Sequence, residues 1–156
     1  MMLLPYSFFL FSCPPFPMQL ATFSHSIDTT EEVLWKLLLD KIERPGRYVP
    51  EAVESEITER PEEGVWVRRM KTEGPEIVER ITADEQARRV TYAALENPVF
   101  DGTIVNEIER GSSGEVVLTF HAEGTPKGDV EEVKAQTEEQ LRSSVLHIKR
   151  VVEDED

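Results

Sequence analysis

Apolar residues recur at helical spacing in two segments of the chain, and the first of these follows a short strand. Residues 21–27, ATFSHSI, alternate between apolar and polar positions, which predicts a strand. Residues 28–42 then carry one apolar stripe, made of Val33, Leu34, Leu37, Leu38 and Ile42. Asp28 and Glu31 have the spacing of a capping box, so we expect the helix to begin there. The prolines and glycine of ERPGRYVP end this helix and leave a short crossing segment with partial helical character.

The second helical pattern lies at the end of the chain. Its apolar stripe consists of Val130, Val133, Leu141, Val145, Ile148 and Val152. Asp129 and Glu132 again have capping-box spacing, which places the start of the helix. Because a long helix with a single apolar stripe needs one continuous partner surface, we expect this helix to pack along a sheet.

Between the two helices the apolar residues alternate with polar ones, which predicts strands. The six predicted strands are residues 52–59, 64–72, 75–82, 87–95, 102–110 and 115–123. Only short turns join them, so neighbouring strands should be antiparallel. Together with the first strand, this pattern predicts an α+β fold in which an antiparallel sheet of about seven strands wraps around the long C-terminal helix.

Turn chemistry predicts how four of these strands pair. The sequence GSSGE fits a three-residue hairpin loop, with a glycine at the left-handed position, and this loop places Asn106 opposite Phe120. The sequence TEGP fits a two-residue loop, which places Arg68 opposite Glu79. Asn106 lies between Ile104 and Ile108 on the core side of its strand, and this register predicts Phe120 as its neighbour.

Two further loops of four residues, 60–63 and 84–87, complete the predicted register. The first places Ser55 opposite Arg68, and the second places Glu79 opposite Tyr92. One row across the inner face of the sheet then becomes largely polar. It contains Ser55, Arg68, Glu79, Tyr92, Asn106 and Phe120.

A polar row inside a sheet needs hydrogen-bond partners, because an unpaired buried amide costs about 1–3 kcal/mol. Arg68 and Glu79 are able to form an ion pair. Two interpretations remain open. The row is either a closed hydrogen-bond network that serves the structure alone, or the lining of a cavity that orients the polar end of a mostly apolar ligand.

Charge excludes some classes of partner. The chain has 31 acidic and 17 basic residues, for a formal net charge of -14. Such a chain repels nucleic-acid phosphates and anionic membrane surfaces, so we expect no nucleic-acid partner and no stable membrane insertion. We expect a monomer or a weak dimer.

Composition also predicts the domain organisation. Residues 1–17 contain no charged side chain and lack the features of a secretion signal, which predicts a disordered extension. Residues 18–152 form one domain, and residues 153–156 form an acidic tail. The single cysteine, Cys13, excludes an internal disulfide and suits a cytoplasmic protein.

Candidate catalytic chemistry is sparse. His25, His121 and His147 are predicted to point in three directions, so no metal site is expected. Phosphate-binding glycine motifs and a serine nucleophile motif are absent from the sequence, so we expect no cofactor. Glu79 and Tyr92 are the candidate proton-transfer groups, but a carboxylate paired with an arginine is a weakened base.

The order and length of the predicted elements resemble the helix-grip fold of the START-like, Bet v 1-like superfamily, also called SRPBCC. Within it, VLWKLLLDKIERPGRYVPEAVESEITE, VWVRRM, EIVERIT, GTIVNEIE and VVLTFHAEG resemble the AtaL-like group, which includes proteins of fungal secondary-metabolite clusters. The resemblance implies a deep hydrophobic pocket between the sheet and the C-terminal helix, and two short helical segments after the first strand. Relatives bind lipids or polyketides, cyclise or dehydrate polyketides, or act as protein partners. The AtaL-like group has no catalytic motif to carry over.

The residues and the resemblance together predict a non-catalytic protein that binds a small hydrophobic or amphiphilic molecule, lipid-like or polyketide-like. One alternative is an enzyme of the polyketide cyclase or dehydratase type that uses Glu79 or Tyr92. A second alternative is a protein-interaction module. The candidate ligand-binding residues are Ser55, Trp66, Arg68, Glu79, Tyr92, Asn106 and Phe120.

Overall fold

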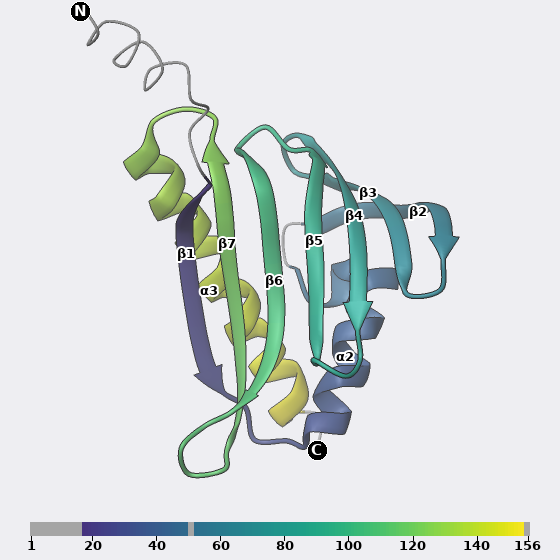
Figure 1. The fold of residues 1–156 in the computed structure, drawn as a ribbon, viewed down its shortest axis with the longest axis vertical. Helices are drawn as coiled ribbons and strands as arrows, with labels where there is room; N and C mark the ends of the chain where they lie inside the picture. The colour runs from purple at the N-terminus through teal and green to yellow at the C-terminus, as the bar shows by residue number, and fades with distance from the viewer. Residues whose placement is uncertain (1–16, 50–51, 155–156) are drawn as a thin grey trace, which may run out of the picture.

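One antiparallel sheet and a long helix behind it make up most of the computed structural model, which describes residues 17–49 and 52–154 (Figure 1). The strands are β1 (Met18–Ser26), β2 (Ala52–Glu62), β3 (Val65–Thr72), β4 (Glu76–Asp84), β5 (Arg89–Glu96), β6 (Phe100–Arg110) and β7 (Val116–Pro126). The helical elements are α2 (Glu31–Glu43), the 3-10 turn η1 (Pro45–Arg47) and α3 (Val130–Asp154). The strand order is β1-β7-β6-β5-β4-β3-β2, so β1 and β2 are the two edges. The predicted α+β helix-grip fold is confirmed.

The N-cap of helix α2 lies two residues later than predicted. Thr30 is the N-cap, in an extended conformation, and its hydroxyl accepts a hydrogen bond from the backbone N–H of Val33 at 3.2 Å. The predicted cap at Asp28 is therefore wrong, because a later side chain satisfies the first turn. Val33 is half exposed, although the predicted stripe included it. The second helical segment is the single turn η1.

Helix α3 begins as predicted. The Asp129 carboxylate accepts a hydrogen bond from the backbone N–H of Glu132 at 3.0 Å, which is the N-cap half of a capping box. The helix buries Val133, Thr137, Leu141, Ser144, Val145 and Ile148. It passes behind β1, β7 and β6 in Figure 1. Cys13, most of the predicted extension and the last two residues of the acidic tail lie outside the described residues, so the domain boundaries stay predictions.

The hairpin loops with clear turn chemistry have the predicted register. Asn106 pairs with Phe120 across β6 and β7, and Arg68 pairs with Glu79 across β3 and β4. In the GSSGE loop the backbone N–H of Gly111 donates to the carbonyl of Glu115 at 2.8 Å. Both predicted pairings are confirmed.

The other two predicted pairings are wrong. Ser55 lies opposite Met70 instead of Arg68, because the β2–β3 turn has only two residues and β2 contains three register shifts. Glu79 lies opposite Ala94 instead of Tyr92, because the β4–β5 loop is residues 85–88. Each error is a shift of two residues. Since side chains alternate with a period of two, such a shift changes neighbours but keeps each side chain on its face.

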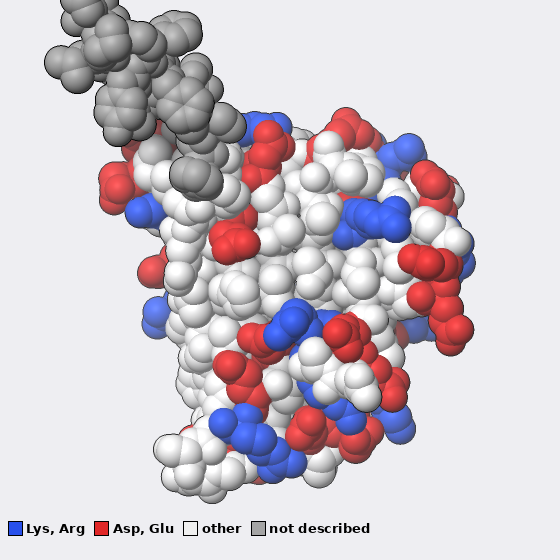
Figure 2. Space-filling view, in the orientation of Figure 1, with Lys and Arg blue, Asp and Glu red and all other residues white. Residues whose placement is uncertain are grey.

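The outer face of the sheet, which faces the viewer in Figure 2, carries mixed groups of acidic and basic side chains on either side of a broad uncharged area. Ion pairs join some of them across neighbouring strands, as between Arg89 and Glu107 at 2.8 Å. Such exposed pairs contribute little to stability. No helix in the described part of the chain is long and apolar enough to cross a membrane.

Candidate functional site

A cavity of about 480 Å³ lies between the inner face of the sheet and α3. Its mouth is formed by the β3–β4 turn, the β5–β6 loop and the first half of α3. Glu73 and Pro75 of the turn and Pro98 of the loop are exposed. Its floor is formed by buried side chains, among them Lys41, Tyr92, Asn106, Phe120 and Arg68. The cavity is of a size typical of small-molecule sites.

Lys41, in the last turn of α2, is the residue of the floor that the sequence analysis missed. Its side chain is buried, with 5% of its surface exposed. The Nζ atom donates hydrogen bonds to the Tyr92 hydroxyl at 3.1 Å and to Asn106 Oδ1 at 3.0 Å. A signal for it existed, because Lys41 is seven residues after Leu34 and three after Leu38 on the predicted apolar stripe.

The pKa of Lys41 is lowered to about 7, chiefly by burial and also by the nearby positive charge of Arg68, against the opposing effect of Glu79. None of the ion pairs within the described ranges involves Lys41. A lysine amine that is desolvated beside another cation loses its proton more readily than an exposed one. Close to neutral pH, a large share of the Lys41 amine is therefore uncharged.

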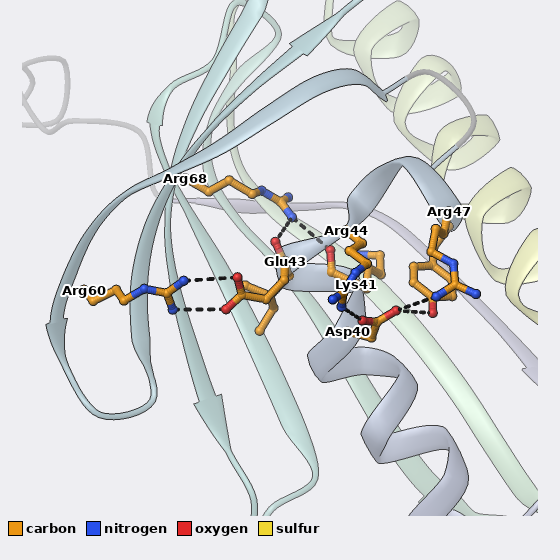
Figure 3. Close-up of polar contacts among 9 residues, drawn as sticks. Asp40, Lys41, Glu43, Arg44, Arg47, Arg60 and Arg68 are labelled. Carbon is orange, nitrogen blue, oxygen red and sulfur yellow. Dashed lines mark hydrogen bonds and ion pairs between the residues drawn. The ribbon is translucent and has the colours of Figure 1, made fainter.

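Arg68 joins the sheet to the end of α2, as Figure 3 shows. Its Nη2 donates to Glu79 Oε1 at 2.8 Å, and its Nη1 donates to the carbonyl oxygens of Lys41 and Ile42, each at 3.1 Å. These carbonyls belong to the last turn of the helix, where cations are favoured. The arginine thus positions Lys41 as well as neutralising Glu79.

Two buried donors of the floor have no hydrogen-bond partner among the described residues. They are Asn106 Nδ2 and Arg68 Nε. The hydrogen bond from Lys41 to Asn106 Oδ1 defines the orientation of the amide and leaves Nδ2 unused. Burial raises the pKa of Tyr92, so its hydroxyl keeps its proton near neutral pH. The floor therefore offers N–H and O–H donors, two of which have no partner among the described residues.

The structure brings five of the seven predicted ligand-binding residues together around the cavity, namely Arg68, Glu79, Tyr92, Asn106 and Phe120. The other two, Ser55 and Trp66, are not among the residues that line it. Ser55 is exposed on the edge strand β2, and Trp66 is half buried opposite Ile81. Whether the five bind a ligand remains a proposal.

His25 and His147 do not line the cavity, and each lies beside a backbone carbonyl oxygen. His25 Nδ1 lies 2.8 Å from the carbonyl oxygen of Ser26, and His147 Nε2 lies 2.9 Å from that of Arg47. Within residues 17–49 and 52–154, no group of His, Cys, Asp and Glu side chains is arranged to hold a metal ion. The chemistry of the floor is therefore that of an amine, a phenol, an amide and an arginine–carboxylate pair.

Several solved structures are similar to this fold. The ZhuI aromatase/cyclase from Streptomyces sp. R1128 is 15% identical, with a TM-score of 0.69 over 90% of this chain and 93% of that chain. An uncharacterised protein from Bacillus thuringiensis is 20% identical, with a TM-score of 0.71 over 84% and 96% of the two chains. XoxI from Bacillus cereus is 20% identical, with a TM-score of 0.71 over 84% and 93%. At these identities the likeness shows the fold alone.

Sequence comparison identifies the family. No curated protein matches the chain by sequence. The family model described as acetylaranotin biosynthesis cluster protein L, AtaL, matches residues 22–154, which run from the middle of β1 to the end of α3 and include the named residues of the cavity floor. The chain therefore belongs to the AtaL family, and it has the helix-grip fold described above.

Proposed function

We propose that the protein binds a small amphiphilic molecule in the cavity, with the polar end of the molecule at the floor. The observation that carries this proposal is the pair of unpartnered donors, Asn106 Nδ2 and Arg68 Nε, on residues that line the cavity. A buried donor without a partner costs about 1–3 kcal/mol, and a ligand acceptor would remove that cost. The cavity is also lined by the apolar residues Met70, Ile77, Val99, Phe100, Ile104, Phe120 and Leu141.

The family supports a lipid-like or polyketide-like ligand. Its description names a biosynthesis cluster, which favours an intermediate or product of secondary metabolism. The helix-grip fold is typical of proteins that bind hydrophobic ligands, and one similar structure is an aromatase/cyclase. A mostly apolar cavity with a few convergent polar groups fits such a molecule.

Binding is favoured over a cyclase or dehydratase that uses Glu79 or Tyr92. Glu79 already accepts a hydrogen bond from Arg68 at 2.8 Å, and a paired carboxylate is a weak base. The raised pKa of Tyr92 keeps the phenol protonated, so it does not act as a base near neutral pH. The open cavity likewise favours a ligand over the interaction-module alternative, in which the protein's own side chains would fill the interior.

Calorimetry with matched ligands tests the proposal. Decan-2-ol supplies a polar end, and decane, presented in the same detergent, lacks one. In Asn106→Leu we expect the affinity for decan-2-ol to fall about tenfold, because its hydroxyl loses a partner worth about 1–3 kcal/mol, while decane binding is unchanged. Tyr92→Phe should show the same direction. Gln86→Leu is the matched control, since this amide is exposed in the β4–β5 loop.

Two results would contradict the proposal. If Asn106→Leu weakened both ligands equally, the polar floor would have no part in recognition. If the wild type bound neither ligand, the cavity would not be a binding site for amphiphilic molecules of this class, and the interaction-module alternative would become the better one.

A further inference from the structure

The amine of Lys41 has an arrangement that simple ligand binding does not require. It lies at the floor of a 480 Å³ cavity that opens to solvent, and its side chain is 5% exposed. Its two recorded hydrogen bonds go to neutral acceptors, the Tyr92 hydroxyl and Asn106 Oδ1, and not to a carboxylate. An uncharged amine has two N–H bonds. Neither acceptor carries a negative charge that would hold the amine in its ammonium form.

We propose that Lys41 is a covalent capture site, at which the amine forms a reversible imine with an aldehyde or ketone group of a ligand held in the cavity. The inference rests on the proposed function, since the ligand must first enter the cavity. It adds the chemical class of the ligand, an amphiphilic carbonyl compound, and the atom that reacts with it.

The reaction is balanced without any further reagent. The lone pair of Nζ attacks the carbonyl carbon, so a C–N bond forms, and a proton moves from nitrogen to the former carbonyl oxygen. The second proton of the nitrogen then passes to this hydroxyl, which leaves as water as the C–O bond breaks and the C=N bond of the imine forms. Water reverses both steps, so nothing is oxidised or reduced. The Tyr92 hydroxyl lies 3.1 Å from Nζ, and the Asn106 amide, which contacts Nζ through Oδ1, has an unpartnered Nδ2. Both groups would supply hydrogen bonds to the oxygen as it develops charge.

The surroundings of Lys41 explain why this lysine reacts and an exposed one does not. A lysine becomes a nucleophile when it is desolvated or lies next to another cation. Lys41 meets both conditions, because it is buried on α2 and Arg68 of β3 lies close by. Glu79 of β4 and Tyr92 of β5 are the other titratable groups around it, and Glu79 is paired with Arg68. The pKa of Lys41, about 7, leaves a large neutral fraction at physiological pH.

Lys36 provides a matched control on the same helix. It is exposed and five residues before Lys41. Its side chain is not among those that line the cavity. Lys36→Met and Lys41→Met make the same chemical change at an exposed and a buried position, and Lys41→Arg retains a cation at the buried position but removes the nucleophilic amine.

The experiment has two stages, both with the full chain. Binding of decan-2-one and decanoate is first measured by calorimetry without a reductant. Decan-2-one is then added with sodium cyanoborohydride, which reduces an imine to a stable secondary amine, and the product is measured by intact mass and peptide mapping. We expect a single addition at Lys41, at least about tenfold faster than at Lys36, and slower below pH 7 as the amine becomes protonated. The addition should be absent in Lys41→Met and Lys41→Arg, and unchanged in Lys36→Met.

The outcomes separate the two proposals. If decan-2-one binds but is not trapped at Lys41, or is trapped equally at exposed lysines, the imine is refuted and the binding function stands. If decanoate alone binds, and loses its affinity in Lys41→Met but not in Lys41→Arg, then Lys41 is a cationic anchor and the imine is again refuted. If neither probe binds, both proposals fail.

Discussion

Replacing Lys41 by methionine should change how the stability of the protein depends on pH. The folded chain holds this amine in a buried site beside Arg68, which lowers its pKa from 10.5 to about 7. Methionine has a similar length, fits an apolar stripe and carries no proton to release. The variant therefore removes one titration and leaves the rest of the helix in place.

The expected size follows from the two pKa values. Between pH 7 and pH 9 the unfolded chain keeps the lysine proton while the folded chain loses it, so the unfolded state binds more protons and stability rises with pH. The wild type should gain about 2 kcal/mol in the free energy of unfolding relative to Lys41→Met over this window. At pH 7 the variant should be the more stable by about 1–3 kcal/mol, because the cost of uncharging a buried lysine exceeds the loss of its hydrogen bonds. Tyr92, whose pKa is raised, stays protonated across the window.

The assay is urea denaturation of both proteins at pH 7, 8 and 9, with Lys36→Met as the control. The control should follow the wild type at every pH, because Lys36 is exposed. Parallel pH profiles for the wild type and Lys41→Met would refute the reasoning. They would mean that the Lys41 amine has the same pKa in the folded and unfolded chains, and the proposed neutral nucleophile would lose its physical basis.

Three further predictions concern stability, each measured by chemical denaturation. Arg68→Leu should lower the free energy of unfolding by about 3–5 kcal/mol, because it leaves the Glu79 carboxylate buried without its partner. Adding Glu79→Leu should recover only part of this loss, since two carbonyls of α2 remain without their donor, and strictly additive losses would show that the pair is not coupled. Thr30→Ala should cost about 1 kcal/mol and Asp28→Ala clearly less, and the reverse order would restore the cap predicted from sequence. Gly102→Ala should cost about 1–3 kcal/mol, because a Cβ there would lie 2.0 Å from a backbone oxygen of β7; an unchanged midpoint would contradict this close approach.

Short-range chemistry accounts for the features that the sequence predicted correctly. The cap at Asp129 depends on one side chain and a backbone N–H three residues away. The pairing of Asn106 with Phe120 follows from the GSSGE loop, and that of Arg68 with Glu79 follows from TEGP. In each case the residues that decide the geometry lie within a few positions of each other, so no knowledge of the rest of the fold is needed.

Long-range packing decided the features that were predicted wrongly or missed. Ser55 does not pair with Arg68, because β2 is an edge strand with three register shifts. A turn sequence does not predict where a strand will bulge. The inward-facing residues of each strand were still predicted correctly, because each register error was a shift of two residues, but their cross-strand neighbours were not. The predicted row is therefore not one straight line of pairs across the sheet.

The sequence by itself determined the helices, the antiparallel meander, the inward face of each strand and two of the cross-strand pairings, because alternation, capping and turn chemistry are local. Only the tertiary structure decided that Lys41, on a helix far from β5 and β6 in the chain, meets Tyr92 and Asn106 at a cavity floor. From the sequence alone, a lysine on an apolar stripe is equally consistent with a position at the edge of the stripe, where its amine reaches water. Burial against the sheet, and the positive charge of Arg68 beside it, are what change its chemistry.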